Sequence, residues 1–162
     1  MQILKHREIV EDPWARLAAG ESAASGAKVI VDWADWLSRR DELKKHSPNL
    51  GVRVPSDVSI EDLGADAAQF ALIAVEFPTF RDGRGYSVAR LLRERYKFLG
   101  ELRAVGYVTR EQLLFMSRVG FDTFELAPGK SLESALGAFS EFSEVYQATG
   151  DGRVPVWRRR RQ

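Results

Sequence analysis

The sequence has no cysteine and only two histidines, His6 and His46. Without cysteine the chain has no disulfide, no thiolate zinc site, no cysteine-bound iron–sulfur cluster and no cysteine nucleophile. The two histidines lie far apart in the sequence, without the HxxxH spacing by which one helix face binds zinc. We therefore predict no metal site and interpret both histidines as surface residues.

Long apolar runs are also missing. No stretch approaches the roughly 20 apolar residues that a membrane-spanning helix needs. The first residues, Met1 to Glu11, carry charges where a signal peptide has an apolar run. The expected location is the cytoplasm, without membrane contact.

The formal net charge is only +1, and Arg153 and Arg158–Arg161 supply five of the 24 basic residues. Nucleic-acid-binding domains usually spread basic residues over one face, so binding to nucleic acid is not expected. A length of 162 residues with 44% hydrophobic content fits one domain. We place this domain at residues 1–150 and a basic tail, of unassigned role, at residues 148–162.

Within the domain, residues 1–17 are predicted to form a hairpin and the small residues 18–27 a connector. Residues 28–147 then alternate strands with helices. This alternation predicts an α/β fold with a mainly parallel sheet of about five strands. A complete eight-unit barrel needs about 250 residues, which this chain lacks. An open three-layer sandwich is the favoured architecture, and half of a β/α barrel is the alternative.

The expected body strands are short apolar runs, and each is followed by a helix signal. They lie at 28–31, 52–54, 71–77, 102–105 and 121–126. Asp32, Ser59 and Ser131 are candidate helix caps, and Thr109-x-x-Gln112 is a capping-box pattern. The segment 131–146 is the most strongly amphipathic helix of the sequence.

One loop concentrates charged residues and glycines, in the run Glu76-Phe-Pro-Thr-Phe-Arg-Asp-Gly-Arg-Gly-Tyr-Ser87. Ligands of parallel sheets bind beyond the carboxyl ends of the strands, where this loop is expected. Glycine backbone amides, the start of the next helix and two arginines suit an oxyanion. The predicted anion-binding residues are Arg81, Gly83, Arg84, Gly85, Tyr86, Ser87, Tyr107 and Arg110. The alternative is a tight turn in which Asp82 or Ser87 caps the helix and the arginines pair with local acids.

The same loop does not match a dinucleotide-binding fingerprint. Val88 stands where the third glycine belongs, and Pro78 lengthens the turn. No cofactor is predicted.

Charged residues also interrupt predicted strands, which is costly in a covered sheet unless the charges are paired. Glu76 and Arg103 lie in successive strands, and we expect them to pair. The pair is either structural or part of a catalytic group of Glu76, Asp82 and Arg103. Tyr107 and Arg110 are expected to border the opening of the same site, just beyond the end of the strand that contains Arg103.

Three segments of the sequence resemble those of one bacterial family. They are Phe77-Pro-Thr-Phe-Arg-Asp-Gly-Arg-Gly-Tyr-Ser-Val-Ala-Arg-Leu-Leu-Arg-Glu-Arg95, Gly100-Glu-Leu-Arg-Ala-Val-Gly106 and Arg118-Val-Gly-Phe-Asp-Thr-Phe-Glu-Leu126. The family is the one called domain of unknown function 934, and its signature maps onto Phe77, Phe80, Asp82, Gly83, Arg84, Gly85, Tyr86, Ser87, Arg103, Gly106 and Gly120-Phe121. Tyr107 departs from it, because members commonly carry an aspartate there.

The resemblance implies a role in sulfur assimilation. Members are typically encoded beside assimilatory sulfite reductase and are often labelled predicted oxidoreductases. The leading hypothesis is an accessory protein that contacts the reductase or its electron donor and senses an oxyanion at Arg81, Arg84 and Arg103. The rival is a small barrel-like enzyme acting on an anionic metabolite, with Glu76 as general base.

A third hypothesis, a flavin-dependent oxidoreductase, predicts a yellow protein. A homodimer is also expected, because an incomplete barrel leaves strand edges open.

Overall fold

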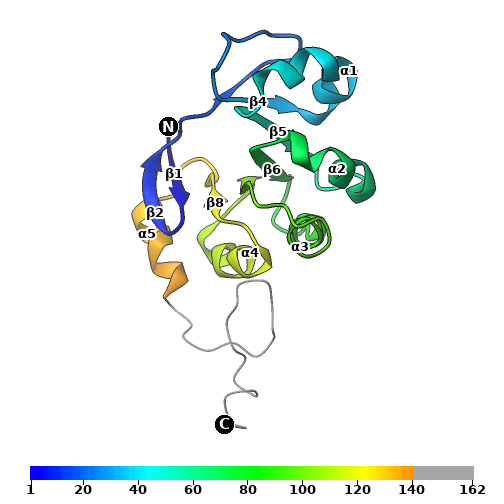
Figure 1. Cartoon of the computed structure of the whole chain (residues 1–162). Helices are drawn as coiled ribbons and strands as arrows, with labels where there is room; N and C mark the ends of the chain where they lie inside the picture. Colours follow the sequence, from blue (N-terminus) through cyan, green and yellow to red (C-terminus); the bar gives the residue numbers. More distant parts are fainter. Residues whose placement is uncertain (141–162) are drawn as a thin grey trace.

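A computed structural model describes residues 1–140 of the chain. Its strands form a single curled sheet (Figure 1) in the order β2-β1-β8-β7-β6-β5-β4-β3. From β3 to β8 all neighbours are parallel, whereas β1 pairs antiparallel with both β2 and β8. The strands are β1 Gln2–Lys5, β2 Glu8–Glu11, β3 Ala15–Arg16, β4 Val29–Asp32, β5 Leu50–Val54, β6 Leu72–Phe77, β7 Glu101–Gly106 and β8 Thr123–Phe124.

The helices pack on one face of this sheet. Each of them contributes a buried side chain to the larger apolar core, namely Trp36, Leu63, Leu92, Met116 and Ala135. The helices are α1 Trp33–Leu43, α2 Ile60–Asp66, α3 Arg84–Glu94, α4 Leu113–Val119 and α5 Leu132–Leu136, with short 3-10 turns at Lys44–His46, Ala67–Gln69, Arg110–Gln112 and Gly137–Phe139.

The predicted α/β class, the parallel body and the N-terminal hairpin are confirmed. The architecture is the curled half-barrel, so the favoured three-layer sandwich is wrong, because the described helices cover only one face. The sheet is also larger than expected and partly antiparallel. The predicted helix 131–146 begins as expected, but its part beyond residue 140 lies outside the described residues.

Most of the predicted helix-start signals are also confirmed. Ser59 accepts a hydrogen bond from the backbone N–H of Asp62, and Ser131 caps α5 in the same way. The capping box of Thr109 and Gln112 is present. Asp32 precedes α1 without a capping hydrogen bond and pairs with Arg16 instead.

The connection from β2 to β3 shows how strongly the sheet curls. These strands stand at opposite ends of the strand order, yet only Asp12–Trp14 separate them in the chain. Four Cα steps span at most about 14 Å. A flat sheet of eight strands would place its outer strands about 34 Å apart. The two edges must therefore approach each other, and residues 12–14, here called the bridging segment, connect them across the inner face.

Trp14 of the bridging segment covers the inner face of the sheet. It packs against a small apolar cluster of four residues from strands β4, β6 and β7, namely Ile30, Leu72, Ala74 and Val105. The almost continuous apolar run of β6 follows from this arrangement, since its residues alternate between the helix side and the covered inner side.

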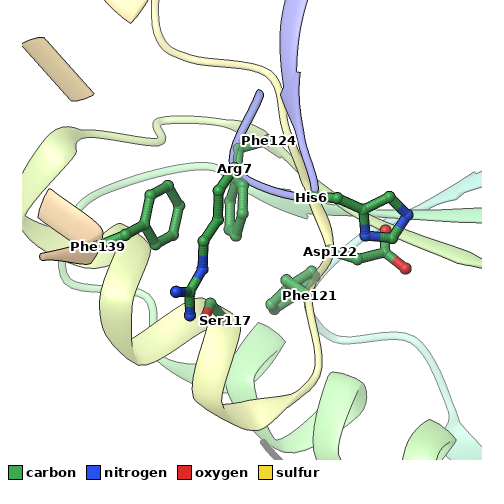
Figure 2. A pocket seen from close by; sticks show the side chains of 7 residues that line it. All are labelled: His6, Arg7, Ser117, Phe121, Asp122, Phe124 and Phe139. Carbon is green, nitrogen blue, oxygen red and sulfur yellow. The ribbon is translucent and has the colours of Figure 1, made fainter. Parts of the chain in front are cut away.

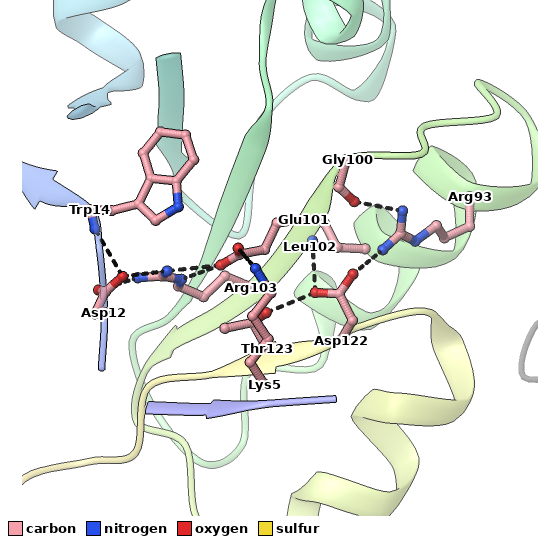
Figure 3. Close-up of polar contacts among 10 residues, drawn as sticks. All are labelled: Lys5, Asp12, Trp14, Arg93, Gly100, Glu101, Leu102, Arg103, Asp122 and Thr123. Atoms are coloured by element: carbon pink, nitrogen blue, oxygen red, sulfur yellow. Dashed lines mark hydrogen bonds and ion pairs between the residues drawn. The ribbon is translucent and has the colours of Figure 1, made fainter. Parts of the chain in front are cut away.

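A buried ionic cluster fixes the bridging segment to the middle of the sheet (Figure 3). Arg103 of β7 is 1% exposed and donates from Nη1 and Nη2 to the Asp12 carboxylate at 2.7 and 2.9 Å. Its Nε and Nη2 also donate to Glu101, and Lys5 donates to the other Glu101 oxygen at 2.6 Å. Two cations and two anions thus balance where lone charges would be costly.

We predict that Asp12→Asn strongly destabilises the fold. The substitution removes the charge that compensates the buried guanidinium, and breaking a buried ion pair typically costs about 3–5 kcal/mol. Urea denaturation of the purified protein measures the loss. Glu11→Gln is the matched control, because the ion pair of Glu11 found within residues 1–140 is with the N-terminal amine and its side chain is 71% exposed. Equal stability of the two variants would contradict the proposed role of the cluster.

Candidate functional site

The loop between β6 and α3 is organised by the carboxylate of Asp82. One oxygen accepts from Ser56 Oγ and from Arg84 Nη2, both at 2.7 Å. The other oxygen accepts from Nε and from the backbone N–H of Arg84 at 3.0 and 3.1 Å. The side-chain hydrogen bonds from Arg84 and then Ser56 hold the pKa of Asp82 well below its usual range.

Asp82 therefore occupies the position at the start of α3 where an external anion was expected. The alternative interpretation therefore holds for Asp82 and Arg84: Asp82 accepts a hydrogen bond from the backbone at the start of α3, and Arg84 pairs with this local acid. Arg81 is different, because it is exposed and pairs with no carboxylate among residues 1–140. Ser87 is also exposed on α3, and it does not cap this helix.

The two glycines of the loop have different surroundings. Gly83 is exposed, and a Cβ there would meet nothing within 4 Å. Gly85 is buried, and a Cβ there would lie 2.6 Å from the ring of Phe77. Close packing of α3 on β6 thus requires the second glycine, whereas the first leaves the backbone open to solvent.

The expected pair of Glu76 and Arg103 is wrong. Glu76 accepts a hydrogen bond at 2.8 Å from Arg53 on the neighbouring strand β5. Arg103 lies opposite Ala74, nearer the beginning of the strands, and its guanidinium is directed to Asp12 and Glu101. Glu76, Asp82 and Arg103 thus have three separate sets of partners, and Arg103 does not lie at the rim with the loop.

Tyr107 contacts the loop through its backbone and its ring. Its backbone N–H donates to the carbonyl of Phe77 at 2.7 Å, next to Gly106 at φ 91°. The ring of Tyr107 lies edge-on to Phe80, with centroids 6.5 Å apart. Arg110 points elsewhere: its Nε donates to the Ser134 carbonyl, and it lines a polar pocket of about 300 Å³ with Lys130 and Ser131.

A groove of about 520 Å³ opens between α3 and α4, beside this loop. It is lined by Phe80, Tyr86, Arg90, Glu111, Gln112, Phe115, Arg118 and Val119. Phe80 and Phe115 are each 57% exposed, and Tyr107 is 45% exposed. We call Phe80, Tyr107 and Phe115 the aromatic patch.

Tyr86, one of the predicted anion-binding residues, forms part of the groove wall. Its ring packs edge-on against Phe77 with centroids 5.4 Å apart, and burial raises the pKa of its hydroxyl. The groove itself was missed from the sequence. A usable signal was Phe115, a large apolar residue that lies off the stripe of Leu113 and Met116 on its helix.

Among residues 1–140, no group of three or more histidines or acidic residues is placed to bind a metal ion. The same part of the chain contains no helix with the length and apolar character needed to cross a bilayer.

Fold and surface together define a half-barrel α/β domain with an exposed aromatic groove beside its glycine-rich loop. The chain belongs to the family described as "Bacterial protein of unknown function (DUF934)", whose model matches residues 51–157. This match begins in β5 and includes the loop, the groove and Arg103. No curated protein and no solved structure matches the chain.

We predict that Asp82→Asn destabilises the protein in a pH-dependent way. The pKa of Asp82 is lowered in the folded chain and is about 3.9 when unfolded, so its stabilising effect is present above that value and is lost as the pH falls. The difference in unfolding free energy between wild type and variant should be largest above about pH 5 and shrink towards pH 3. Urea denaturation across this range measures it.

The control for this prediction is Asp41→Asn, which changes an exposed carboxylate on α1, outside this loop. That variant should remain close to wild type at every pH. A difference for Asp82→Asn that does not vary with pH would show that its charge does not stabilise the loop.

Proposed function

We propose that this protein is an accessory protein of assimilatory sulfite reduction that binds the reductase or its electron donor through the aromatic patch. The observation that carries the proposal is the exposure of Phe80 and Phe115, which line one groove, and of Tyr107, whose ring contacts Phe80. Clustered aromatic side chains on a surface are typical of binding sites for other proteins. The link to sulfite reduction rests on the family resemblance of the sequence.

The energetics of the patch suit protein contact. Burying an exposed phenylalanine side chain is worth about 1.5–3 kcal/mol, and aromatic residues are enriched among those that dominate binding energy. Arg90, Glu111 and Arg118 also line this groove. A central apolar area with charged residues at its margin is the usual composition of an interface.

The separation of the expected catalytic residues supports contact over catalysis. Asp82 is engaged by Arg84 and Ser56, while Arg103 is buried among carboxylates. An oxyanion at this surface would meet Arg81 and the open backbone at Gly83, because the Arg84 guanidinium already binds Asp82. Arg81 therefore replaces Arg103 as the main cation of the proposed oxyanion site.

One observation favours the rival enzyme. Glu76 lies near the carboxyl end of β6 on the inner face, and its side chain is 37% exposed beside Arg53. Active sites of β/α barrels lie at this end of the strands. In that proposal Glu76 is the general base and Arg53 orients its carboxylate.

Binding to the reductase is tested with purified components. We expect the tagged protein to recover the sulfite reductase haemoprotein or its flavoprotein donor, and Phe80→Ala/Phe115→Ala to weaken binding at least tenfold. Leu37→Ala/Leu99→Ala is the matched control, because these leucines are 49% and 94% exposed outside the groove. Recovery of neither protein by the wild type would refute the proposed partners.

Growth on sulfate as the sole sulfur source distinguishes the two functions. Deletion of the gene should impair growth, and a Glu76→Gln copy should restore it whereas a Phe80→Ala/Phe115→Ala copy should not. The opposite result, with Glu76→Gln inactive and the aromatic double variant active, would favour the enzyme. Unimpaired growth of the deletion strain would remove the role in sulfite reduction altogether.

A further inference from the structure

A further cavity, of about 260 Å³, lies beneath the tip of the N-terminal hairpin (Figure 2). It is close to the beginning of β8, whereas the glycine-rich loop follows the end of β6. Its walls come from the hairpin turn, α4, the segment before β8 and the turn after α5. The lining residues are His6, Arg7, Ser117, Phe121, Asp122, Phe124 and Phe139.

The hairpin turn has unusual residues for its backbone conformation. Lys5 pairs with Glu8, so His6 and Arg7 are the two turn residues, and their φ angles are 50° and 67°. Two-residue turns of this kind require positive φ at both positions and favour Asn-Gly, because other side chains are strained there. The chain instead has two large side chains at the turn, the imidazole of His6 and the cationic guanidinium of Arg7, and both line the cavity.

Arg7 has no acidic partner among the described residues. Its guanidinium lies 5.4 Å from the ring centroid of Phe139, which is a cation–π contact and leaves the charge without a carboxylate. The acid of the cavity, Asp122, is already engaged by Arg93 at 2.9 Å, by the Leu102 N–H and by the Thr123 hydroxyl. Within residues 1–140, the positive charge of Arg7 at the cavity mouth is therefore not compensated by a carboxylate.

Ser117 offers a hydroxyl beside this charge. Figure 2 shows the guanidinium end of Arg7 directed toward Ser117, and no hydrogen bond of that hydroxyl is found within residues 1–140. The rest of the wall is aromatic, formed by Phe121, Phe124 and Phe139. One end of the cavity thus suits an anion and the remainder suits an apolar group.

We propose that this cavity binds a small carboxylate that carries an aromatic or branched apolar group. The carboxylate accepts hydrogen bonds from the Arg7 guanidinium and the Ser117 hydroxyl. The apolar group lies on the three phenylalanine rings. This binding accounts for the strained His6-Arg7 turn, because an Asn-Gly turn provides neither the charge nor the stem that packs on Phe139.

The ligand class is tested by NMR titration of the ¹⁵N-labelled full chain with phenylacetate. We expect saturable shifts of the His6, Arg7 and Ser117 amide signals. Phenylacetamide, which has the same shape but no charge, should bind at least tenfold more weakly, as should inorganic sulfate. Equal binding of phenylacetamide would overturn the role of Arg7, equal binding of sulfate would overturn the role of the rings, and no saturable shift would overturn the site.

Two variants separate binding from structure. Arg7→Met keeps an apolar stem and the turn, and should weaken phenylacetate binding at least tenfold, while Arg95→Met, at an exposed arginine paired with Glu61, should bind as wild type does. His6→Asn/Arg7→Gly should raise the melting temperature and abolish binding, because the turn strain is relieved. A lowered melting temperature would show that Arg7 is structural, and retained binding in either Arg7 variant would also overturn the proposal.

Discussion

The ion pair between Asp12 and Arg103 is the contact on which the shape of this domain depends. It joins a three-residue segment between the sheet edges to the middle of β7, with N–O distances of 2.7 and 2.9 Å. The hydrophobic effect drives the helices onto the outer face but does not specify how far the sheet curls. The bidentate ion pair specifies how far the sheet curls, because both carboxylate oxygens of Asp12 must contact the guanidinium of Arg103 at the same time.

Because side chains fill the inner face of the sheet, the surfaces available for binding lie mainly on the outside of the fold. Trp14 and the ionic cluster occupy the inner region, where a larger barrel would have layers of core side chains below its active site. The aromatic patch and the hairpin cavity instead lie among helices and turns. Binding proposals for this chain therefore concern the outer surface, while Glu76 is the main candidate on the inner side.

Much of the local structure was readable from the sequence, because capping and strand signals depend on neighbouring residues. Ser59, Ser131 and the capping box of Thr109 show this. The partner of Arg103 was not readable, since Asp12 is remote in sequence and approaches only when the sheet curls. The glycine-rich loop was located correctly, but the sequence did not reveal that Asp82 satisfies its own helix start and neighbouring arginine.

Helix α4 contributes to both proposed binding surfaces but with different residues. Phe115 lines the groove beside α3, whereas Ser117 lines the hairpin cavity. Residues two apart on a helix point about 200° apart around its axis, so one helix can face two separate sites. Met116, between them in sequence, is fully buried in the core and fixes the orientation of the helix. A substitution at Phe115 therefore changes one face of α4, whereas Arg7 of the hairpin turn lines the cavity on the face that carries Ser117. The two proposals can be tested independently.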